Sequence, residues 1–113
     1  MTLDQIIKSK ALPSFCTSNI DVIESILFFC NIKKLPCLIE STSNQVNQHG
    51  GYTNKTPKMF VKEISNLTKK IKFNSKRLFL GGDHLGPLPW NKKSKDIAIK
   101  NSVLLINAYL NEN

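Results

Sequence analysis

The sequence predicts an α/β fold built around parallel strands. Three short apolar segments, at residues 11–16, 35–40 and 78–80, have the length and composition of buried strands. Each is followed by a longer segment in which apolar residues recur at helical spacing. Because strands and helices alternate along the chain, we expect the strands to be parallel and joined by right-handed crossovers.

The first strand lies between two predicted helices. A short opening helix can be capped by Thr2 and ends at the polar residues 8–10. After the strand, Ser18 or Asn19 can cap the first main helix, which ends at residues 33–34. We expect this main helix to be heavily buried, because its apolar stripe is wide. The apolar residues are Leu3, Ile6 and Ile7 in the opening helix, and Val22, Ile23, Ile26, Leu27, Phe28, Phe29 and Cys30 in the main helix.

The second strand ends at Glu40 and leads into a polar loop, residues 41–53. This loop is far longer than a connector requires, and long loops after parallel strands often carry function. Thr56 can then cap a helix with Pro57 in its first turn, where proline is favoured. The expected buried side of this helix consists of Phe60, Ile64, Leu67 and Ile71.

The third strand leads to two glycines, an acid and a histidine. Neighbouring side chains on a regular strand point to opposite faces. Glycine accepts positive φ and a close backbone approach, so we expect Gly81 and Gly82 to kink the chain and turn Asp83 and His84 into one pocket. A last helix is expected from Ser94, with a buried stripe of Ile99, Val103, Ile106 and Leu110.

Polar residues follow all three predicted strands directly, at 16–19, 40–53 and 83–90. The carboxyl ends of parallel strands lie at one edge of the sheet, where α/β barrels and open α/β sheets have their binding sites. The sequence therefore predicts a functional site at this edge.

The composition is that of a single small soluble domain, with 113 residues of which 41% are hydrophobic and 21% charged. No segment approaches the roughly 20 apolar residues of a membrane span, and the first ten residues contain no apolar signal region. We therefore expect a cytoplasmic protein without a membrane partner. The cysteines lack CxxC spacing and are expected to be buried free thiols. They are Cys16, Cys30 and Cys37.

The net charge of +8 comes from lysines spread along the chain, and Arg77 is the single arginine. Proteins that read bases usually combine arginines with aromatic platforms, and no basic run here is interleaved with aromatic residues. We therefore expect no nucleic-acid partner. A positive field would still favour anionic sugar phosphates.

Two long motifs carry a resemblance to a known family. They are Leu-Ile-Glu-Ser-Thr-Ser-Asn-Gln-Val-Asn-Gln-His-Gly-Gly-Tyr-Thr at residues 38–53 and Leu-Gly-Gly-Asp-His-Leu-Gly-Pro at residues 80–87. Together with residues 15–19, they closely resemble the accessory-subunit family of tagatose-bisphosphate aldolase, called GatZ/KbaZ-like. The resemblance implies a TIM barrel of the class II aldolase type, which needs about 250 residues. Residues 1–113 are thus expected to be an N-terminal fragment of one such domain, with about three strand–helix units.

The same resemblance implies an accessory role. Such a subunit supports the activity and stability of a catalytic class II aldolase subunit, its expected partner, which cleaves tagatose 1,6-bisphosphate in galactitol and tagatose catabolism. The fragment alone is expected to be inactive. An older name of the family is tagatose-6-phosphate kinase, but the sequence has no glycine-rich phosphate loop followed by Lys and Ser or Thr.

The pair Asp83-His84 also resembles the Asp-His pair of catalytic class II aldolases, in which the Asp transfers protons and the His binds zinc. The resemblance makes Asp83 a candidate acid/base and His84 a candidate zinc ligand. Zinc polarises a ketose carbonyl and stabilises the enediolate, but catalytic zinc needs three protein ligands. The other ligands would lie beyond Asn113 in the full-length protein. The alternative function is therefore a metal-dependent ketose-phosphate aldolase or epimerase in its own right.

The remaining candidate residues could bind a sugar phosphate or could be structural. Glu40 is either a binding carboxylate or a buried ion-pair partner. The loop amides either bind sugar hydroxyls or satisfy the backbone of the loop. His49 is more readily explained as a loop residue, and Tyr52 and Trp90 as residues that pack the loops. The candidate substrate-binding residues are Glu40, Asn44, Gln45, Gln48, Gly50, Gly51 and Tyr52.

Overall fold

The computed structural model of the chain describes residues 2–9 and 11–112, apart from the side chains of residues 3, 7 and 9. Within this part, the chain forms one sheet of three parallel strands in the order β1-β2-β3. This arrangement confirms the predicted α/β class and the parallel strands. The strands are β1 (Ser14–Cys16), β2 (Cys37–Thr42) and β3 (Leu78–Asp83).

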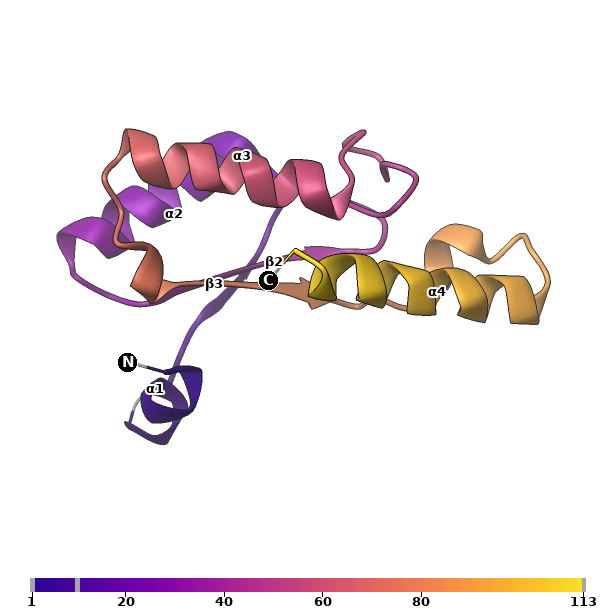
Figure 1. Cartoon of the computed structure of the whole chain (residues 1–113), viewed down its shortest axis with the longest axis horizontal. Coiled ribbons are helices and arrows are strands. Elements are labelled where there is room, and N and C mark those ends of the chain that lie inside the picture. Colours follow the sequence, from indigo (N-terminus) through magenta and orange to yellow (C-terminus); the bar gives the residue numbers. More distant parts are fainter. Residues whose placement is uncertain (1, 10, 113) are drawn as a thin grey trace.

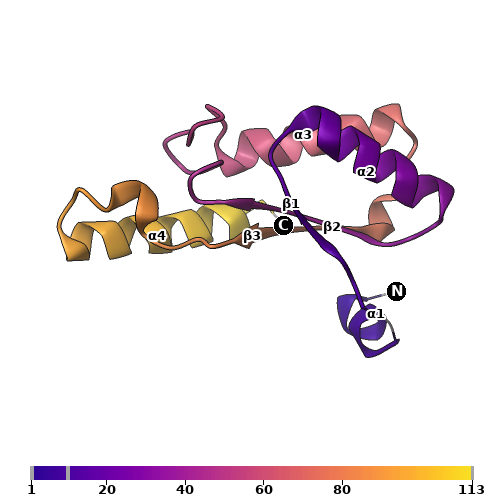
Figure 2. The same cartoon turned by 180° about the vertical axis from the view of Figure 1, so that it is seen from behind.

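The helices lie on different sides of the sheet. Helices α2 and α3 lie side by side over one face, whereas α1 lies on the opposite side of the sheet (Figures 1 and 2). Helix α4 extends beyond the carboxyl end of β3, and only its last turn returns to the strands (Figure 1). The helices are α1 (Leu3–Ser9), α2 (Ile20–Ile32), α3 (Pro57–Lys70) and α4 (Lys95–Leu110), with the 3-10 turns η1 (Ser75–Arg77) and η2 (Leu88–Trp90).

Capping contacts confirm the predicted starts of α2 and α3. The Asn19 side chain accepts hydrogen bonds from the backbone N–H groups of Asp21 and Val22, at 3.0 and 3.1 Å. The Thr56 hydroxyl accepts from the first turn of α3, where Pro57 occupies the first helical position. Each cap satisfies backbone donors that have no partner within the helix.

The core lies between the sheet and helices α2 and α3. Along β2, Cys37, Ile39 and Ser41 are buried, while the alternate residues are only half-buried. This alternation points one face of the sheet toward the helices. The buried apolar residues of this core include Ile23, Leu27, Cys30, Cys37, Ile39, Phe60, Ile64 and Leu67.

All three strands have bounds that differ from the prediction. Strand β1 begins at Ser14, three residues later than expected. Strand β2 begins two residues later than expected and includes residues 41–42, which were assigned to the loop. Strand β3 continues through both glycines to Asp83. The reason is pairing between strands, because Gly81 and Gly82 lie in register with Glu40 and Ser41 of β2.

Two predictions about buried helix faces were wrong. Val22, Phe28 and Phe29 of α2 are exposed, because the buried stripe of this helix is narrower than expected and consists of Ile23, Leu27 and Cys30. The expected buried stripe of α4 is exposed along its whole length, and the neighbouring stripe is buried instead. In the opening helix Ile6 is buried, while the side chains of residues 3 and 7 and all of residue 10 lie outside the described part. The exposed stripe of α4 is Ile99, Val103, Ile106 and Leu110, and the buried one is Ala98, Ser102, Leu105 and Tyr109.

Within the described ranges, no helix combines the length and apolar character required to cross a bilayer.

Candidate functional site

A row of polar side chains lies on the sheet face that points away from α2 and α3. The register places Cys16 beside Glu40, and Thr42 beside Asp83. The Ser14 hydroxyl donates a hydrogen bond to the Glu40 carboxylate. Glu40 is therefore held by β1 and is available as a hydrogen-bond acceptor on this face, with no lysine or arginine paired to it in the described part.

The thiol of Cys16 lies beside two carboxylates. Partial burial raises its pKa, and so do a hydrogen bond to Asp83 and the negative charges of Asp83 and Glu40. Such a thiol stays protonated and is a poor nucleophile. The prediction of buried free thiols holds for Cys30 and Cys37, but Cys16 is exposed, because it lies near the open end of the sheet.

The two glycines of β3 make room for side chains rather than a kink. A Cβ at Gly81 would lie 3.1 Å from Glu40 Oε1, and a Cβ at Gly82 would lie 2.4 Å from Leu85 Cδ1. Neither glycine has a positive φ. The expected kink at these glycines was therefore wrong, and their function is to let Glu40 and Leu85 approach the backbone.

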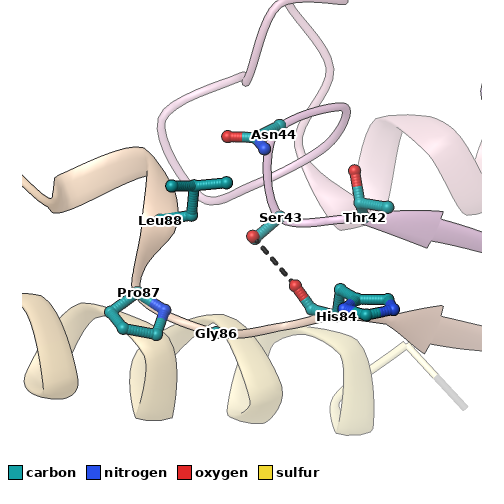
Figure 3. Close-up of a pocket in the computed structure, with 7 residues that line it drawn as sticks. All are labelled: Thr42, Ser43, Asn44, His84, Gly86, Pro87 and Leu88. Atoms are coloured by element: carbon teal, nitrogen blue, oxygen red, sulfur yellow. Dashed lines mark hydrogen bonds between the residues drawn. The ribbon is translucent and has the colours of Figure 1, made fainter.

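Asp83 and His84 do approach each other, and His84 itself makes the turn. Its φ is +49°, in the left-handed region. Asp83 Oδ1 lies 3.6 Å from His84 Nε2, and the imidazole side chain is 85% exposed. The Ser43 hydroxyl donates a hydrogen bond of 3.0 Å to the His84 carbonyl, which fixes the turn against the end of β2 (Figure 3).

The described residues do not form a complete zinc site. In residues 2–9 and 11–112, no group of three His, Cys, Asp or Glu side chains is placed to hold a metal ion. His84 and Asp83 supply two neighbouring donor groups, whereas a catalytic zinc site uses three protein ligands. The set of donors therefore does not fit the ion without further ligands, and we assign no chemical step to a metal.

Two of the candidate amides hold the loop together. Gln45 Oε1 accepts a hydrogen bond of 2.8 Å from the Thr42 N–H, and the Gln45 carbonyl accepts from the Thr53 hydroxyl at 2.7 Å. Gln48 Nε2 donates to the carbonyl of Asn101 on α4 at 3.0 Å. These contacts favour the structural interpretation of Gln45 and Gln48, because one amide group of each side chain is used within the chain. The other group of Gln48, its Oε1, is buried without a hydrogen-bond partner in the described part.

The glycines of the loop have positive φ, +105° at Gly50 and +56° at Gly51. A Cβ at Gly51 would lie 2.5 Å from the carbonyl oxygen of Gln45. Asn47 closes the same turn, because its Oδ1 accepts from the N–H groups of His49 and Gly51 at 2.8 and 3.2 Å. Gly50 and Gly51 thus shape the loop.

Asn44 differs from the other amides. Its side chain makes no hydrogen bond within the described part of the chain and borders a pocket of about 450 Å³ at the ends of β2 and β3. The Ser43 hydroxyl lies in the middle of the labelled residues, with Asn44 and Leu88 on the far side from His84 (Figure 3). The pocket is lined by Thr42, Ser43, Asn44, His84, Gly86, Pro87 and Leu88. Hydroxyl, amide and imidazole groups in one pocket can hydrogen-bond a polyhydroxylated ligand.

The two aromatic residues of the loops behave differently from each other. Trp90 packs as expected and is only 9% exposed. Tyr52 was also expected to pack the loops, but it is 70% exposed, so this prediction was wrong. The structure leaves the candidate binding role of Tyr52 open, because its ring is accessible.

Asn101 and Tyr109 of α4 were missed by the sequence analysis. The Tyr109 hydroxyl is hydrogen-bonded to the Ser41 hydroxyl of β2, and Asn101 contacts Gln48 and His49. Burial raises the pKa of Tyr109, and the bond to Ser41 opposes this in part. No local sequence signal could have found these contacts, because the partners are 52 to 68 residues apart.

Comparisons with known proteins agree on one family. The family described as D-tagatose-1,6-bisphosphate aldolase subunit GatZ/KbaZ-like matches residues 2–113. Proteins named D-tagatose-1,6-bisphosphate aldolase subunit GatZ, from Shigella boydii and Escherichia coli, are 44% identical over 97 residues, which are 86% of this chain and 23% of theirs. The chain thus spans about a quarter of the length of these relatives.

A solved structure leads to the same conclusion. The crystal structure of a probable tagatose 6 phosphate kinase from Sinorhizobium meliloti matches with a TM-score of 0.86 and 40% identity, over 91% of this chain and 27% of that one. Its name carries the older kinase label that the resemblance led us to expect. The match over residues 2–113 shows that the chain belongs to the D-tagatose-1,6-bisphosphate aldolase subunit GatZ/KbaZ-like family.

Proposed function

We propose that the chain is part of an accessory subunit of a D-tagatose-1,6-bisphosphate aldolase and supports a catalytic class II aldolase subunit in the cytoplasm. The observation that carries this proposal is the family match, which extends over residues 2–113. The 44% identity to proteins named as subunits of this aldolase supports it. In this role the chain contributes to carbohydrate breakdown by assembling with the catalytic aldolase subunit.

We further propose that β1, β2 and β3 are the first three strands of a TIM barrel. The parallel order β1-β2-β3 supports this, as do the polar residues at the carboxyl ends of the strands. In a closed barrel, further strands would pair with the free edges of β1 and β3, and further helices would cover the exposed stripe of α4.

The donor groups at the strand ends support an accessory role more than a catalytic one. His84 is mostly exposed and has one carboxylate neighbour, and partial burial together with the carboxylates beside it raises the pKa of the Cys16 thiol. The sugar phosphate of the complex would meet this chain through Glu40 and the pocket beside Ser43, Asn44 and His84. These groups hydrogen-bond a ligand without supplying a complete metal site.

Co-expression tests the accessory role. The full chain is tagged and produced together with a catalytic class II tagatose-bisphosphate aldolase subunit, and an unrelated tagged protein of similar size and charge serves as the control. We expect the tagged chain to capture the aldolase and to raise its specific activity or its half-life on heating. Neither capture nor any change in activity or half-life would exclude the accessory role.

The 3.6 Å approach of Asp83 to His84 favours one second candidate function, a metal-dependent aldolase or epimerase of ketose phosphates. A zinc ion in that arrangement would draw further ligands from outside the described residues. This function requires stoichiometric metal and turnover without a partner subunit, both lost in His84→Ala. Turnover that survives this substitution, or metal-free protein after reconstitution, would exclude it.

A further inference from the structure

We propose that a second pocket, between the loop after β2 and the turn η2, binds the uncharged hydroxylated part of a sugar. This pocket has a volume of about 620 Å³ and shares only Asn44 with the pocket of Figure 3. The proposal rests on the proposed function, because it names the part of a sugar substrate that this subunit would hold. The pocket is lined by Asn44, Asn47, His49, Gly51, Tyr52, Pro89 and Trp90.

One wall of this pocket is rigid. Trp90 is only 9% exposed, and the His49 ring stands edge-on to it with centroids 6.3 Å apart and an interplanar angle of 79°. His49 Nε2 lies 3.4 Å from Asn101 Oδ1 of α4, and this contact helps to hold the imidazole in place. An aromatic wall that is fixed before binding costs little conformational entropy when a ligand packs against it.

Tyr52 forms the accessible side of the pocket. Its ring is 70% exposed, although its backbone is fixed by a hydrogen bond of 2.9 Å to the Asn44 carbonyl. An exposed aromatic ring on a fixed backbone offers a flat apolar surface. The C–H groups on one face of a sugar ring are apolar and can pack against such a surface.

The Asn44 amide is the main free polar group of this pocket, and no carboxylate lies beside it. Asn47 already uses its amide in bonds to Ser43, His49 and Gly51. The Asn44 amide makes no hydrogen bond within the described part, and it offers both donors and an acceptor. None of the lining residues is Lys, Arg, Asp or Glu, and the one basic group among them is the His49 imidazole. A phosphate would therefore meet no lysine or arginine here, whereas sugar hydroxyls match an amide well.

The fluorescence of Trp90 provides the test, because it is the only tryptophan of the chain. The full chain is titrated with D-tagatose, and separately with D-tagatose 1,6-bisphosphate at physiological salt. We expect a saturable change in fluorescence with D-tagatose, with a dissociation constant in the millimolar range. The bisphosphate should bind no more tightly, because no lysine or arginine lines the pocket.

Three variants separate this pocket from general effects. Tyr52→Ala should weaken D-tagatose binding about tenfold, whereas Tyr52→Phe keeps the ring and should retain most of it. Phe28→Ala removes another exposed aromatic ring, on α2 and away from the pocket, and should leave binding unchanged. Circular dichroism checks that each variant is folded. If Tyr52→Ala unfolds, Tyr52→Phe preserves the test.

Three results would overturn the proposal. They are no saturable response to D-tagatose, equal affinity of folded Tyr52→Ala and the unchanged chain, and much tighter binding of the bisphosphate. None of them is a test of the accessory role, which is read from capture and activity of the aldolase. The two proposals can therefore fail separately.

Discussion

The Ser43 hydroxyl donates a 3.0 Å hydrogen bond to the backbone carbonyl of His84. This bond joins the carboxyl end of β2 to that of β3, and it borders the pocket of Figure 3. Ser43 is buried, so removing its hydroxyl leaves the carbonyl without this partner. The turn at His84, with its positive φ, depends on contacts of this kind to persist.

Ser43→Ala should lower the free energy of unfolding by about 1 to 2 kcal/mol. Equilibrium unfolding in urea measures this loss. Ser25→Ala is the matched control, because the Ser25 hydroxyl bonds to the Asp21 carbonyl on the exposed surface of α2. It should change the free energy much less. An equal loss in both variants would show that the bond to His84 contributes no more to the free energy of unfolding than the exposed bond of Ser25.

Gly51→Ala should destabilise the chain by about 2 kcal/mol or more, because an L residue is strained at its φ of +56°. The added Cβ would also lie 2.5 Å from the Gln45 carbonyl oxygen, which is backbone and cannot move aside alone. The midpoint of thermal unfolding measures the effect.

Gly86→Ala is the control for Gly51→Ala. No heavy atom lies within 4 Å of a Cβ at Gly86, and its φ is not positive. This variant should keep or slightly raise stability, because alanine restricts the unfolded chain. Similar losses at the two glycines would contradict the loop conformation described here.

The stability of the chain should fall in alkaline solution. Burial, together with the neighbouring Cys30 thiol, raises the pKa of Cys37 from 9.0 to about 12. At a pH between these two pKa values, the Cys37 thiol loses its proton in the unfolded chain but keeps it in the folded chain. The stabilisation is therefore complete below pH 9.0 and is lost as the pH rises toward about 12, by up to ~1.4 kcal/mol per pH unit.

Cys37→Ala isolates this contribution, because it removes one titrating thiol and leaves the lysines and Tyr109 in place. The variant is expected to be less stable at neutral pH, since a buried side chain is truncated. Its free energy of unfolding should nevertheless decline less steeply with pH. Parallel pH profiles for the two proteins would exclude a raised pKa at Cys37.

The exposed stripe of α4 should make the chain self-associate when it is alone. Ile99, Val103, Ile106 and Leu110 are all exposed on this stripe. Exposed apolar patches favour association, and one charge within the patch opposes it. We expect Val103→Lys to shift the chain toward monomer in sedimentation velocity experiments.

Asn66→Lys adds the same charge at an exposed polar position of another helix, α3. It should leave the association largely unchanged, because it lies outside the apolar stripe of α4. Equal shifts for Val103→Lys and Asn66→Lys would attribute the effect to net charge. A chain that is monomeric without any substitution would contradict the prediction directly.

Local signals in the sequence predicted the order of the strands and α-helices, but not the two 3-10 turns. Asn19 and Thr56 cap helices where their side chains were expected to do so, and Pro57 occupies the first turn of α3. These signals are local, since a cap depends on residues two or three positions away. The motifs at residues 38–53 and 80–87 also carried the family resemblance, which the comparisons confirmed. The assigned roles of Asp83, His84 and Glu40 stay predictions.

Tertiary structure alone decided which side of α4 is buried and where the loop amides bind. Helix α4 has apolar residues on two sides, and the stripe of Leu105 and Tyr109 is buried because Tyr109 reaches Ser41 of β2. Gln48 bonds to Asn101, a residue 53 positions away. The glycines of β3 stay in the strand because β2 pairs with them. Each of these outcomes depends on a partner distant in sequence, and periodicity and capping signals describe only neighbours along the chain.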